Sequence, residues 1–368
     1  MSVARSQGKA IISVAKTQRG VYSLACTVMV NLKQVAVLAG VSTATVSHVL
    51  NNTARVSPKL RERVLKVARE LNYQPNSLAR SLVTRRSNVV GMVITDIMNP
   101  FYGALTRGAE DVLAREGYTL LVGNSDGNCE KEEAYYRTFL AKRLDGFLLI
   151  TCPTEYPPSY LSRHNAEETP VVLMNRNYPG VRADTVMADS EEGSWRAVTH
   201  LLEMGHRRIG IITGPAQHVS SQQRLLGYKR ALHEHRLPVE DELIREGQFD
   251  VKSGYERAKR LLSLRDRPTA LYAFNAAMSM AALRAIFDSG LRCPEDVALV
   301  SFDDIEWFDL IRPRITAVAQ PSYELGATSA QTILDRISER LSSPPQKTIL
   351  KTELIVRESS NWRPAVSS

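Results

Sequence analysis

Aromatic, cationic, amide and acidic side chains come directly after several predicted strands of this chain. They are Phe101, Tyr102, Arg176, Asn275 and Asp303. Because the carboxyl ends of neighbouring parallel strands meet at one edge of a sheet, we expect these side chains to lie close together. Aromatic rings stack on the face of a sugar or a base, and Arg, Asn and Asp form paired hydrogen bonds with polar groups. The set predicts a binding site for a small polar molecule.

One short motif is typical of a catalytic serine. Gly123-Asn124-Ser125-Asp126-Gly127 matches the G-x-S-x-G pattern of hydrolases at a strand end. Such a match arises easily by chance, and the pattern places no His as a base. The sequence also lacks G-x-x-x-x-G-K-[ST], a G-x-G-x-x-G motif after a strand, and H-E-x-x-H. We therefore expect no enzyme, no catalytic residue, no metal and no cofactor, and a hydrolase is a minor alternative.

The cysteines and the apolar runs indicate the compartment. Cys26, Cys129, Cys152 and Cys293 lie far apart and form no C-x-x-C pair. This spacing argues against a disulfide framework and a zinc ribbon. No apolar run approaches the ~18 residues of a membrane-spanning helix. We expect a cytoplasmic protein with no membrane partner.

From residue 89 onwards, apolar strands alternate with amphipathic helices. The predicted strands cover residues 89–95, 118–123, 146–151, 171–174, 209–213, 270–272 and 298–302. The predicted helices cover residues 106–116, 130–142, 190–204, 225–235, 253–264 and 278–289. This alternation predicts parallel sheets covered by helices on both faces. Its extent, roughly 270 residues, predicts two lobes rather than one.

The charge is distributed unevenly along the chain. Residues 1–88 contain 14 Lys and Arg but only two acidic residues, which gives a net charge of +12, whereas the whole chain carries +8. The remaining residues are therefore mildly acidic, at −4. A strongly basic segment in front of an acidic body is typical of a module that binds a polyanion such as nucleic acid.

The basic segment contains the pattern of a helix–turn–helix. Asn31 can cap a first helix, Gly40 ends it, and a second short helix covers residues 43–50. Ser57-Pro58 opens a third helix. On the second helix, Thr43, Ala44, Ser47 and His48 project outward. Thr43, Ala44 and His48 occupy the positions that face base edges in a major groove, while the hydroxyls of Thr45 and Ser47 meet phosphates.

Taken together, these motifs resemble the LacI/GalR family of bacterial transcriptional regulators over roughly residues 30–360. The matching residues at the front are Val35-Ala36, Ala39-Gly40-Val41-Ser42, Ala44-Thr45-Val46-Ser47, Val49-Leu50-Asn51, Val56-Ser57-Pro58, Leu71-Asn72-Tyr73-Gln74-Pro75-Asn76 and Ala79-Arg80-Ser81-Leu82. The matching residues in the body are Asp96-Ile97-Met98-Asn99-Pro100-Phe101, Gly205-His206-Arg207-Arg208-Ile209-Gly210, Ser301-Phe302-Asp303-Asp304 and Val356-Arg357-Glu358-Ser359.

The resemblance implies a small all-α helix–turn–helix domain followed by an α/β body of two lobes, similar to type I periplasmic binding proteins. It also implies sequence-specific DNA binding by a repressor. Its recognition helix would be the second helix, and residues 76–83 would form a hinge helix that orders on operator DNA. The further DNA-binding residues that it implies are Asn51, Tyr73, Ala79 and Leu82, of which Leu82 wedges into the minor groove. His48 departs from the family, which most often has Arg there, so the operator half-site can differ.

For the body, the resemblance adds Arg224 and Phe249 to the predicted effector site. Ala276 departs from the family, which usually carries Asp there, and this removes one carboxylate from the rim of the site. A sugar or sugar derivative is the first candidate effector, and a purine is the second. Solute-binding proteins of transport systems share the same body, but they do not carry a helix–turn–helix in front of it.

The predicted domains follow from these boundaries. Residues 1–29 are a disordered tail or precede the true start at Met29, residues 30–75 form the helix–turn–helix domain, and residues 76–88 form the hinge helix and linker. Residues 89–360 form the effector-binding and dimerisation domain, and residues 361–368 form a tail. Because too few residues follow Ser359 for a tetramerisation helix, we expect a homodimer that binds palindromic double-stranded operator DNA.

Overall fold

The structure of this protein is a computed structural model that describes residues 31–51, 55–73, 86–152, 154, 156–164, 169–178, 180–338 and 344–361. The chain divides into two compact units, residues 1–80 and 81–368. The predicted tail over residues 1–29 and the predicted hinge helix over 76–83, with Ala79 and Leu82, lie outside the described residues.

The described residues of the first unit form three short helices, α1 (Leu32–Ala39), α2 (Thr43–Asn51) and α3 (Pro58–Glu70). Asn31 and Gln34 exchange side chain to backbone hydrogen bonds of 2.9 and 3.1 Å at the start of α1, which forms a capping box. Gly40 turns the chain at a φ of +64°, a conformation that favours glycine. The three helices share one apolar core, made of Val35, Ala36, Ala39, Val46, Val49, Val64 and Ala68. The predicted helix–turn–helix is confirmed.

The first lobe of the second unit is built on a parallel sheet of six strands. These strands are β1 (Val89–Ile94), β2 (Thr119–Asn124), β3 (Gly146–Leu149), β4 (Val171–Met174), β5 (Asp184–Ala188) and β11 (Lys347–Leu350), in the order β11-β5-β4-β3-β1-β2. On one face pack α5 (Pro100–Arg115) and α13 (Ser322–Ile337). On the other face pack α6 (Cys129–Ala141) and the short α7 (Ser159–Ser162).

The second lobe repeats this architecture around a second sheet of six strands. These strands are β6 (Ile209–Thr213), β7 (Ile244–Glu246), β8 (Ala270–Ala273), β9 (Ala298–Phe302), β10 (Thr316–Ala319) and β12 (Glu353–Ile355), in the order β12-β10-β9-β8-β6-β7. All pairs are parallel except β10 with β12. The helices of this lobe are α8 (Ser190–Glu203), α9 (Val219–Glu234), α10 (Val251–Leu262), α11 (Ala276–Phe287) and α12 (Trp307–Leu310), with 3-10 turns at Asp241–Leu243 and Glu358–Ser360.

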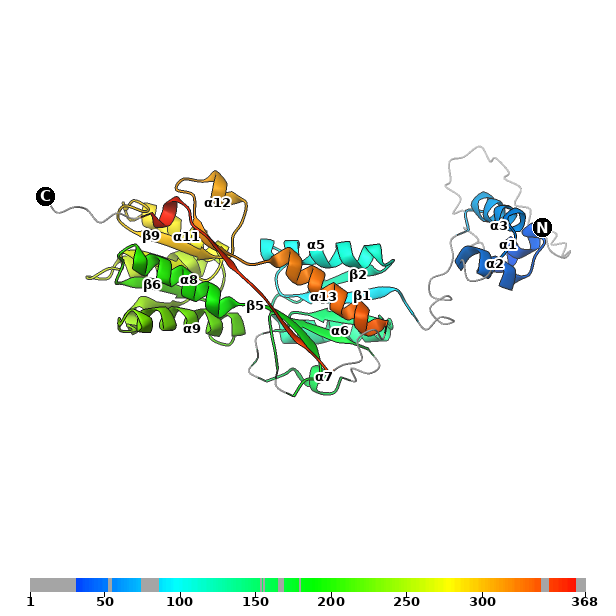
Figure 1. Ribbon diagram of the computed structural model, residues 1–368, viewed down its shortest axis with the longest axis horizontal. Helices are drawn as coiled ribbons and strands as arrows, with labels where there is room; N and C mark the ends of the chain where they lie inside the picture. Colours follow the sequence, from blue (N-terminus) through cyan, green and yellow to red (C-terminus); the bar gives the residue numbers. More distant parts are fainter. Residues whose placement is uncertain are drawn as a thin grey trace, which may run out of the picture. The chain divides into compact units, whose positions relative to one another are not determined.

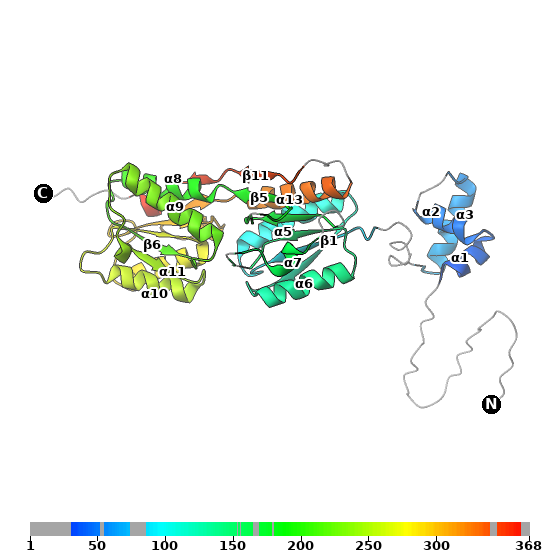
Figure 2. The same ribbon diagram turned by 90° about the horizontal axis from the view of Figure 1, so that it is seen from below.

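The chain passes between the two lobes at residues 188–190, 319–322 and 350–353. These connections join β5 to α8, β10 to α13, and β11 to β12, and Figures 1 and 2 show that they run side by side along one edge of the two lobes. Three short connections between two packed cores permit the lobes to move about this edge while each core stays intact.

All seven predicted strands are present, whereas β5, β7, β10, β11, β12 and helix α13 were not predicted. Most of the missed strands mix polar with apolar residues over three to five positions, as in Asp184–Ala188 and Lys347–Leu350, whereas the short strands that were predicted are mainly apolar runs. The predicted two-lobed α/β body is confirmed.

Candidate functional site

A cavity of about 420 Å³ lies between the two lobes of the second unit. All seven side chains that the sequence indicated for a small-molecule site line it: Phe101, Tyr102, Arg176, Arg224, Phe249, Asn275 and Asp303. The volume is within the range of small-molecule pockets in proteins. The fold therefore brings the predicted residues together, and their part in binding stays a prediction.

The first lobe contributes two aromatic rings at the start of α5. The side chain of Asn99 caps this helix by accepting a hydrogen bond from the N–H of Phe101 at 3.0 Å. The rings of Phe101 and Tyr102 pack edge to face with centroids 5.0 Å apart. Thr95 Oγ1 donates to the Tyr102 hydroxyl at 2.6 Å, and burial raises the pKa of Tyr102. Tyr102 is therefore a neutral, fixed part of the cavity wall.

In the second lobe, Asn275 fixes two parts of the cavity at once. Its Oδ1 accepts from the N–H of Met278 at 2.9 Å and so caps α11, while its Nδ2 donates to the carbonyl of Phe249 at 2.8 Å. Phe249 has a φ of +61°, in the left-handed region that a residue with a side chain rarely adopts. The hydrogen bond from Asn275 holds this backbone and aims the ring of Phe249 at the cavity.

Arg224 and Asp303 form the charged floor of the cavity. The guanidinium of Arg224 lies 3.6 Å from the centroid of the Phe302 ring and donates to the carbonyl of Phe274. Its Nη2 lies 3.9 Å from Asp303 Oδ1, and both side chains are buried. No described residue accepts a hydrogen bond from the buried Nε of Arg224. A buried cation with an unused donor is costly unless a ligand supplies an acceptor.

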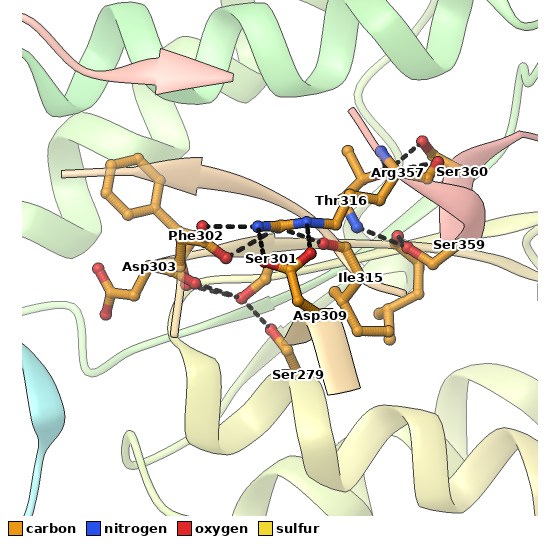
Figure 3. A network of polar contacts seen from close by, with 12 residues as sticks. Ser279, Ser301, Phe302, Asp303, Asp309, Ile315, Thr316, Arg357, Ser359 and Ser360 are labelled. Atoms are coloured by element: carbon orange, nitrogen blue, oxygen red, sulfur yellow. Dashed lines mark hydrogen bonds and ion pairs between the residues drawn. The ribbon is translucent and has the colours of Figure 1, made fainter. Parts of the chain in front are cut away.

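The backbone at Asp303 is held by a network of polar contacts. Asp303 has a φ of +70°, and the Ser301 hydroxyl, which accepts from Ser279 at 2.7 Å, donates to its carbonyl at 3.1 Å. The next residue, Asp304, receives two hydrogen bonds of 2.8 and 2.9 Å from Arg357. Figure 3 shows that the carboxylate of Asp303 points away from this network. Burial raises the pKa of this carboxyl, and Gln320 donates to it at 2.5 Å.

Arg176 enters the cavity from the end of β4. Its guanidinium donates to the carbonyl of Thr154 and lies 5.0 Å from the centroid of the Tyr178 ring. Its Nε is buried and has no acceptor among the described residues. The cavity is thus lined by two guanidinium groups, each with one N–H that has no acceptor among the described residues.

Among the cavity-wall residues that the sequence analysis missed are His218 and Gln320. The ring of His218 packs edge to face on Phe249, with centroids 5.2 Å apart. Burial, together with the charges of Arg176 and Arg224, lowers the pKa of His218 to about 4, so its imidazole is neutral near pH 7. His218 follows β6, a predicted strand, so the rule that sites lie after strands could have found it, whereas Gln320 follows β10, which was not predicted.

In the first unit, the surface of α2 matches the prediction for a recognition helix. Thr43, Ala44 and His48 are exposed, Thr45 and Ser47 are half-buried, and Val46 and Val49 point into the core. The Ser42 hydroxyl caps the helix by accepting from the N–H of Thr45 at 3.1 Å. Asn51 lies at the end of α2, and Tyr73 is half-buried against the core. These positions suit DNA contacts by the exposed residues.

Comparison with known proteins decides the family. The family model described as "Bacterial regulatory proteins, lacI family" matches residues 31–76, and the "Periplasmic binding protein-like domain" matches residues 198–360. The HTH-type transcriptional repressor PurR of Aliivibrio fischeri (strain MJ11) is 38% identical over 314 residues, which are 85% of this chain and 93% of that protein. The chain belongs to the LacI family.

Solved structures of LacI-family proteins agree with this assignment. The transcriptional regulator CelR in complex with cellobiose is 33% identical, with a TM-score of 0.67 over 89% of this chain and 99% of that one. The lac repressor dimer bound to operator and the anti-inducer ONPF is 26% identical, with a TM-score of 0.81 over 90% and 99%. This LacI-family protein is thus a DNA-binding transcriptional repressor with an effector domain.

The LacI family consists of transcriptional regulators and is not enzymatic. Membership of it therefore excludes the two alternative functions, a hydrolase and a solute-binding component of a transport system. Ser125, the candidate nucleophile, is fully buried and its hydroxyl donates to the carbonyl of Ile94 at 3.1 Å. This serine therefore connects two strand ends. Among the described residues, no helix is long and apolar enough to cross a membrane.

Ala276, the departure from the usual LacI-family Asp, lies at the first position of α11. It is buried and does not line the cavity. Position 276 therefore carries no carboxylate, and among the described residues that line the cavity Asp303 is the buried acidic residue.

The expectation from cysteine spacing is wrong for one pair. Cys129 and Cys152 form a disulfide, with their Cα atoms 5.3 Å apart. They are separated by 23 positions in the sequence, and only the packing of α6 against the end of β3 brings them together. Cys293 is buried and is not bonded to another cysteine.

Proposed function

We propose that this repressor binds a palindromic operator as a homodimer, and that a sugar or sugar derivative bound between the lobes sets its operator affinity. The observation that carries the proposal is the pairing, in one buried cavity, of the donors Arg176, Arg224 and Asn275 with the acceptor Asp303. Vicinal hydroxyls both donate and accept, so a sugar can form hydrogen bonds with the carboxylate and with the guanidinium groups at the same time.

The aromatic walls support the same class of effector. Phe101 comes from the first lobe and Phe249 from the second, and both line the cavity. Aromatic rings stack on the apolar face of a sugar ring, which leaves its hydroxyls directed at polar groups. The CelR structure, which is 33% identical to this chain, is titled as a complex with cellobiose, a sugar.

A purine is the second candidate effector. A planar base can lie between two aromatic walls, and its ring carbonyls and nitrogens can accept from Arg176 and Arg224. The neutral imidazole of His218 adds a donor or an acceptor to the same wall.

Control of DNA binding follows from closure of the lobes on the effector. The connections at residues 188–190, 319–322 and 350–353 permit such a movement. A ligand that contacts both lobes, as one between Phe101 and Phe249 must, binds the closed state more tightly than the open one. It shifts the equilibrium by that difference in affinity. The proposed hinge helix over residues 76–83 would transmit the shift to the helix–turn–helix.

The exposed edge of the first sheet supports the dimer. β2 is the last strand in the order of its sheet and presents Leu121 and Val122, which are 38% and 36% exposed. An apolar edge strand in water is a site of unwanted association unless a partner covers it. A second copy, related by a twofold axis, would cover both edges and place two recognition helices on the half-sites of a palindrome.

The domain boundaries belong to this proposal. Residues 30–75 would read the operator, residues 76–88 would form the hinge helix and linker, and residues 89–360 would bind the effector and form the dimer. The division of the chain into units at Arg80 supports a boundary in the linker region.

A thermal-shift screen of the full chain against sugars, sugar acids, sugar phosphates and purines tests the effector. A ligand at about 100 times its dissociation constant stabilises the folded state by about 2.7 kcal/mol. Each hit is repeated on Arg224→Ala, with Arg230→Ala as the matched control, because Arg230 lies on the outer face of the same helix. A sugar hit lost only in Arg224→Ala supports the proposal. Hits among purines alone favour the second candidate, and no hit overturns both.

The same hit then decides how the effector acts on DNA. Operator affinity is measured by gel shift with and without the ligand, on wild type and on Arg224→Ala. We expect the ligand to change the affinity of the wild type and to leave that of Arg224→Ala unchanged. An equal change in both proteins would refute the assignment of the cavity.

A further inference from the structure

The disulfide Cys129–Cys152 lies beside the proposed effector cavity. Cys129 is the first residue of α6 and is exposed, whereas Cys152 follows β3 and is fully buried. Ile150 and Thr151, which directly precede Cys152, line the cavity. The bond therefore ties the start of α6 to a segment of the cavity wall.

That segment also holds Arg176. The hydroxyls of Thr151 and Thr154 each lie 3.0 Å from the hydroxyl of Tyr178, and the carbonyl of Thr154 accepts from the Arg176 guanidinium. Arg176 in turn lies over the Tyr178 ring. A movement of the backbone around residue 152 would therefore change the position of a cavity guanidinium.

One other contact joins α6 to Cys152 in the described part of the chain. Glu132, one turn after Cys129, accepts a hydrogen bond from the N–H of Cys152 at 2.5 Å. Its second carboxylate oxygen accepts from the hydroxyl of Tyr160, and the side chain is fully buried. If the disulfide is reduced, this hydrogen bond and the apolar packing of Tyr136 and Phe139 hold α6 to β3 and the segment after it, without a covalent link.

We propose that Cys129 and Cys152 are a thiol–disulfide exchange site, through which low-molecular-weight thiols and disulfides control how firmly Arg176 is held in the effector cavity. The proposal goes beyond effector binding and gives the repressor a second, redox input. The disulfide state fixes the segment, and the dithiol state releases it.

The reduction of this disulfide needs one class of co-reactant, a low-molecular-weight thiol. A thiolate attacks the sulfur of Cys129, the exposed residue of the pair, the bond to Cys152 breaks, and Cys152 leaves as a thiolate that takes up a proton. A second thiol attacks the mixed disulfide and releases the Cys129 thiol. The protein disulfide is reduced by two electrons while two thiols become one disulfide, and the reverse reaction consumes a low-molecular-weight disulfide such as oxidised glutathione.

The surroundings of the two sulfurs favour exchange at Cys129. Cys129 is the exposed residue of the pair, and it lies at the N-terminus of α6, a helix of 13 residues, where the helix dipole favours a thiolate. Cys293 provides the contrast, because it is buried and burial raises the pKa of its thiol to about 12. Of these two positions, Cys129 is therefore the one where a small thiol or disulfide can react.

The first experiment measures whether the pair exchanges. The full chain carrying Cys26→Ser and Cys293→Ser is equilibrated in mixtures of reduced and oxidised glutathione, quenched in acid and labelled with a thiol-reactive mass tag. We expect a single two-thiol transition within the accessible range of glutathione ratios. The proposal is overturned if the pair stays a disulfide in millimolar reduced glutathione, or stays reduced in millimolar oxidised glutathione.

The second experiment measures the consequence for Arg176 by hydrogen–deuterium exchange of the same protein in both redox states. We expect peptides covering residues 146–164 and 171–178 to exchange several-fold faster in the reduced state, with no change in residues 209–302. Adding Cys129→Ser to this protein should reproduce the reduced pattern in either buffer. Equal exchange of the two peptides in both states refutes the proposal. Neither experiment uses an effector, so a failed ligand screen and a failed redox test are distinguishable.

Discussion

Glu132 provides a quantitative test of the packing beside the cavity. Its carboxyl is fully buried, and burial raises its pKa to about 7, although hydrogen bonds from Tyr160 and Cys152 oppose this shift. The ordinary value is 4.5. Between these two pH values, the folded protein therefore holds a proton at Glu132 that the unfolded chain has already released.

The sign and size of the effect follow from proton linkage. Where the folded state binds more protons, the free energy of unfolding falls as pH rises, at about 1.4 kcal/mol per pH unit for one proton. From pH 4.5 to 7, Glu132 alone should lower the free energy of unfolding by about 3 kcal/mol. Below pH 4.5 and well above pH 7, both states carry the same charge at this residue and the contribution is constant.

Glu132→Gln removes this titration. The difference in free energy of unfolding between Glu132→Gln and wild type, measured by urea denaturation with the disulfide intact, should shift in favour of the variant by about 3 kcal/mol between pH 4.5 and 7.5. Glu130→Gln is the matched control, because Glu130 lies in the same helical turn and is exposed. A difference that stays constant with pH for Glu132→Gln would show that burial does not control this carboxyl.

Three further predictions concern packing, assembly and DNA binding. Gly326→Ala should lower the free energy of unfolding by about 2 kcal/mol or more, because the added Cβ would lie 1.9 Å from the carbonyl oxygen of Leu105. Gly103→Ala is the control and should not lower it, because nothing lies within 4 Å of a Cβ added there. Urea denaturation measures both variants, and equal effects would contradict the close packing of α5 and α13. Val122→Asp should convert the proposed dimer to a monomer in analytical ultracentrifugation. Leu140→Asp is the control, because Leu140 is a similarly exposed apolar residue of α6, and this variant should stay a dimer. If both variants stay dimers, the interface lies elsewhere. Operator affinity in gel shifts should fall steeply between about 50 and 200 mM salt, and insensitivity to salt would refute phosphate binding by the basic segment.

Local patterns were sufficient for much of this protein. The capping residue Asn31, the turn at Gly40 and the apolar spacing of Val35, Val46 and Val49 identified the helix–turn–helix, because caps, turns and helical periodicity act within a few residues. The residues after β1, β4, β8 and β9 were predicted to meet, and the cavity contains them. That prediction succeeded because parallel strands always direct their carboxyl ends to one edge of a sheet.

Other features depend on contacts between distant parts of the chain. The short strand β10 and helix α13 were missed, and with them Gln320, because pairing with β9 and packing against α5 decide their structure. Only the packing of α6 on the end of β3 brings Cys129 to Cys152 and buries the side chain of Glu132. Burial and long-range pairing depend on residues that are far apart in the sequence, so local sequence patterns did not predict these features. The sequence by itself determined the kinds of elements and the chemistry of the cavity, whereas tertiary structure decided the hinge between the lobes, the disulfide and the buried charges.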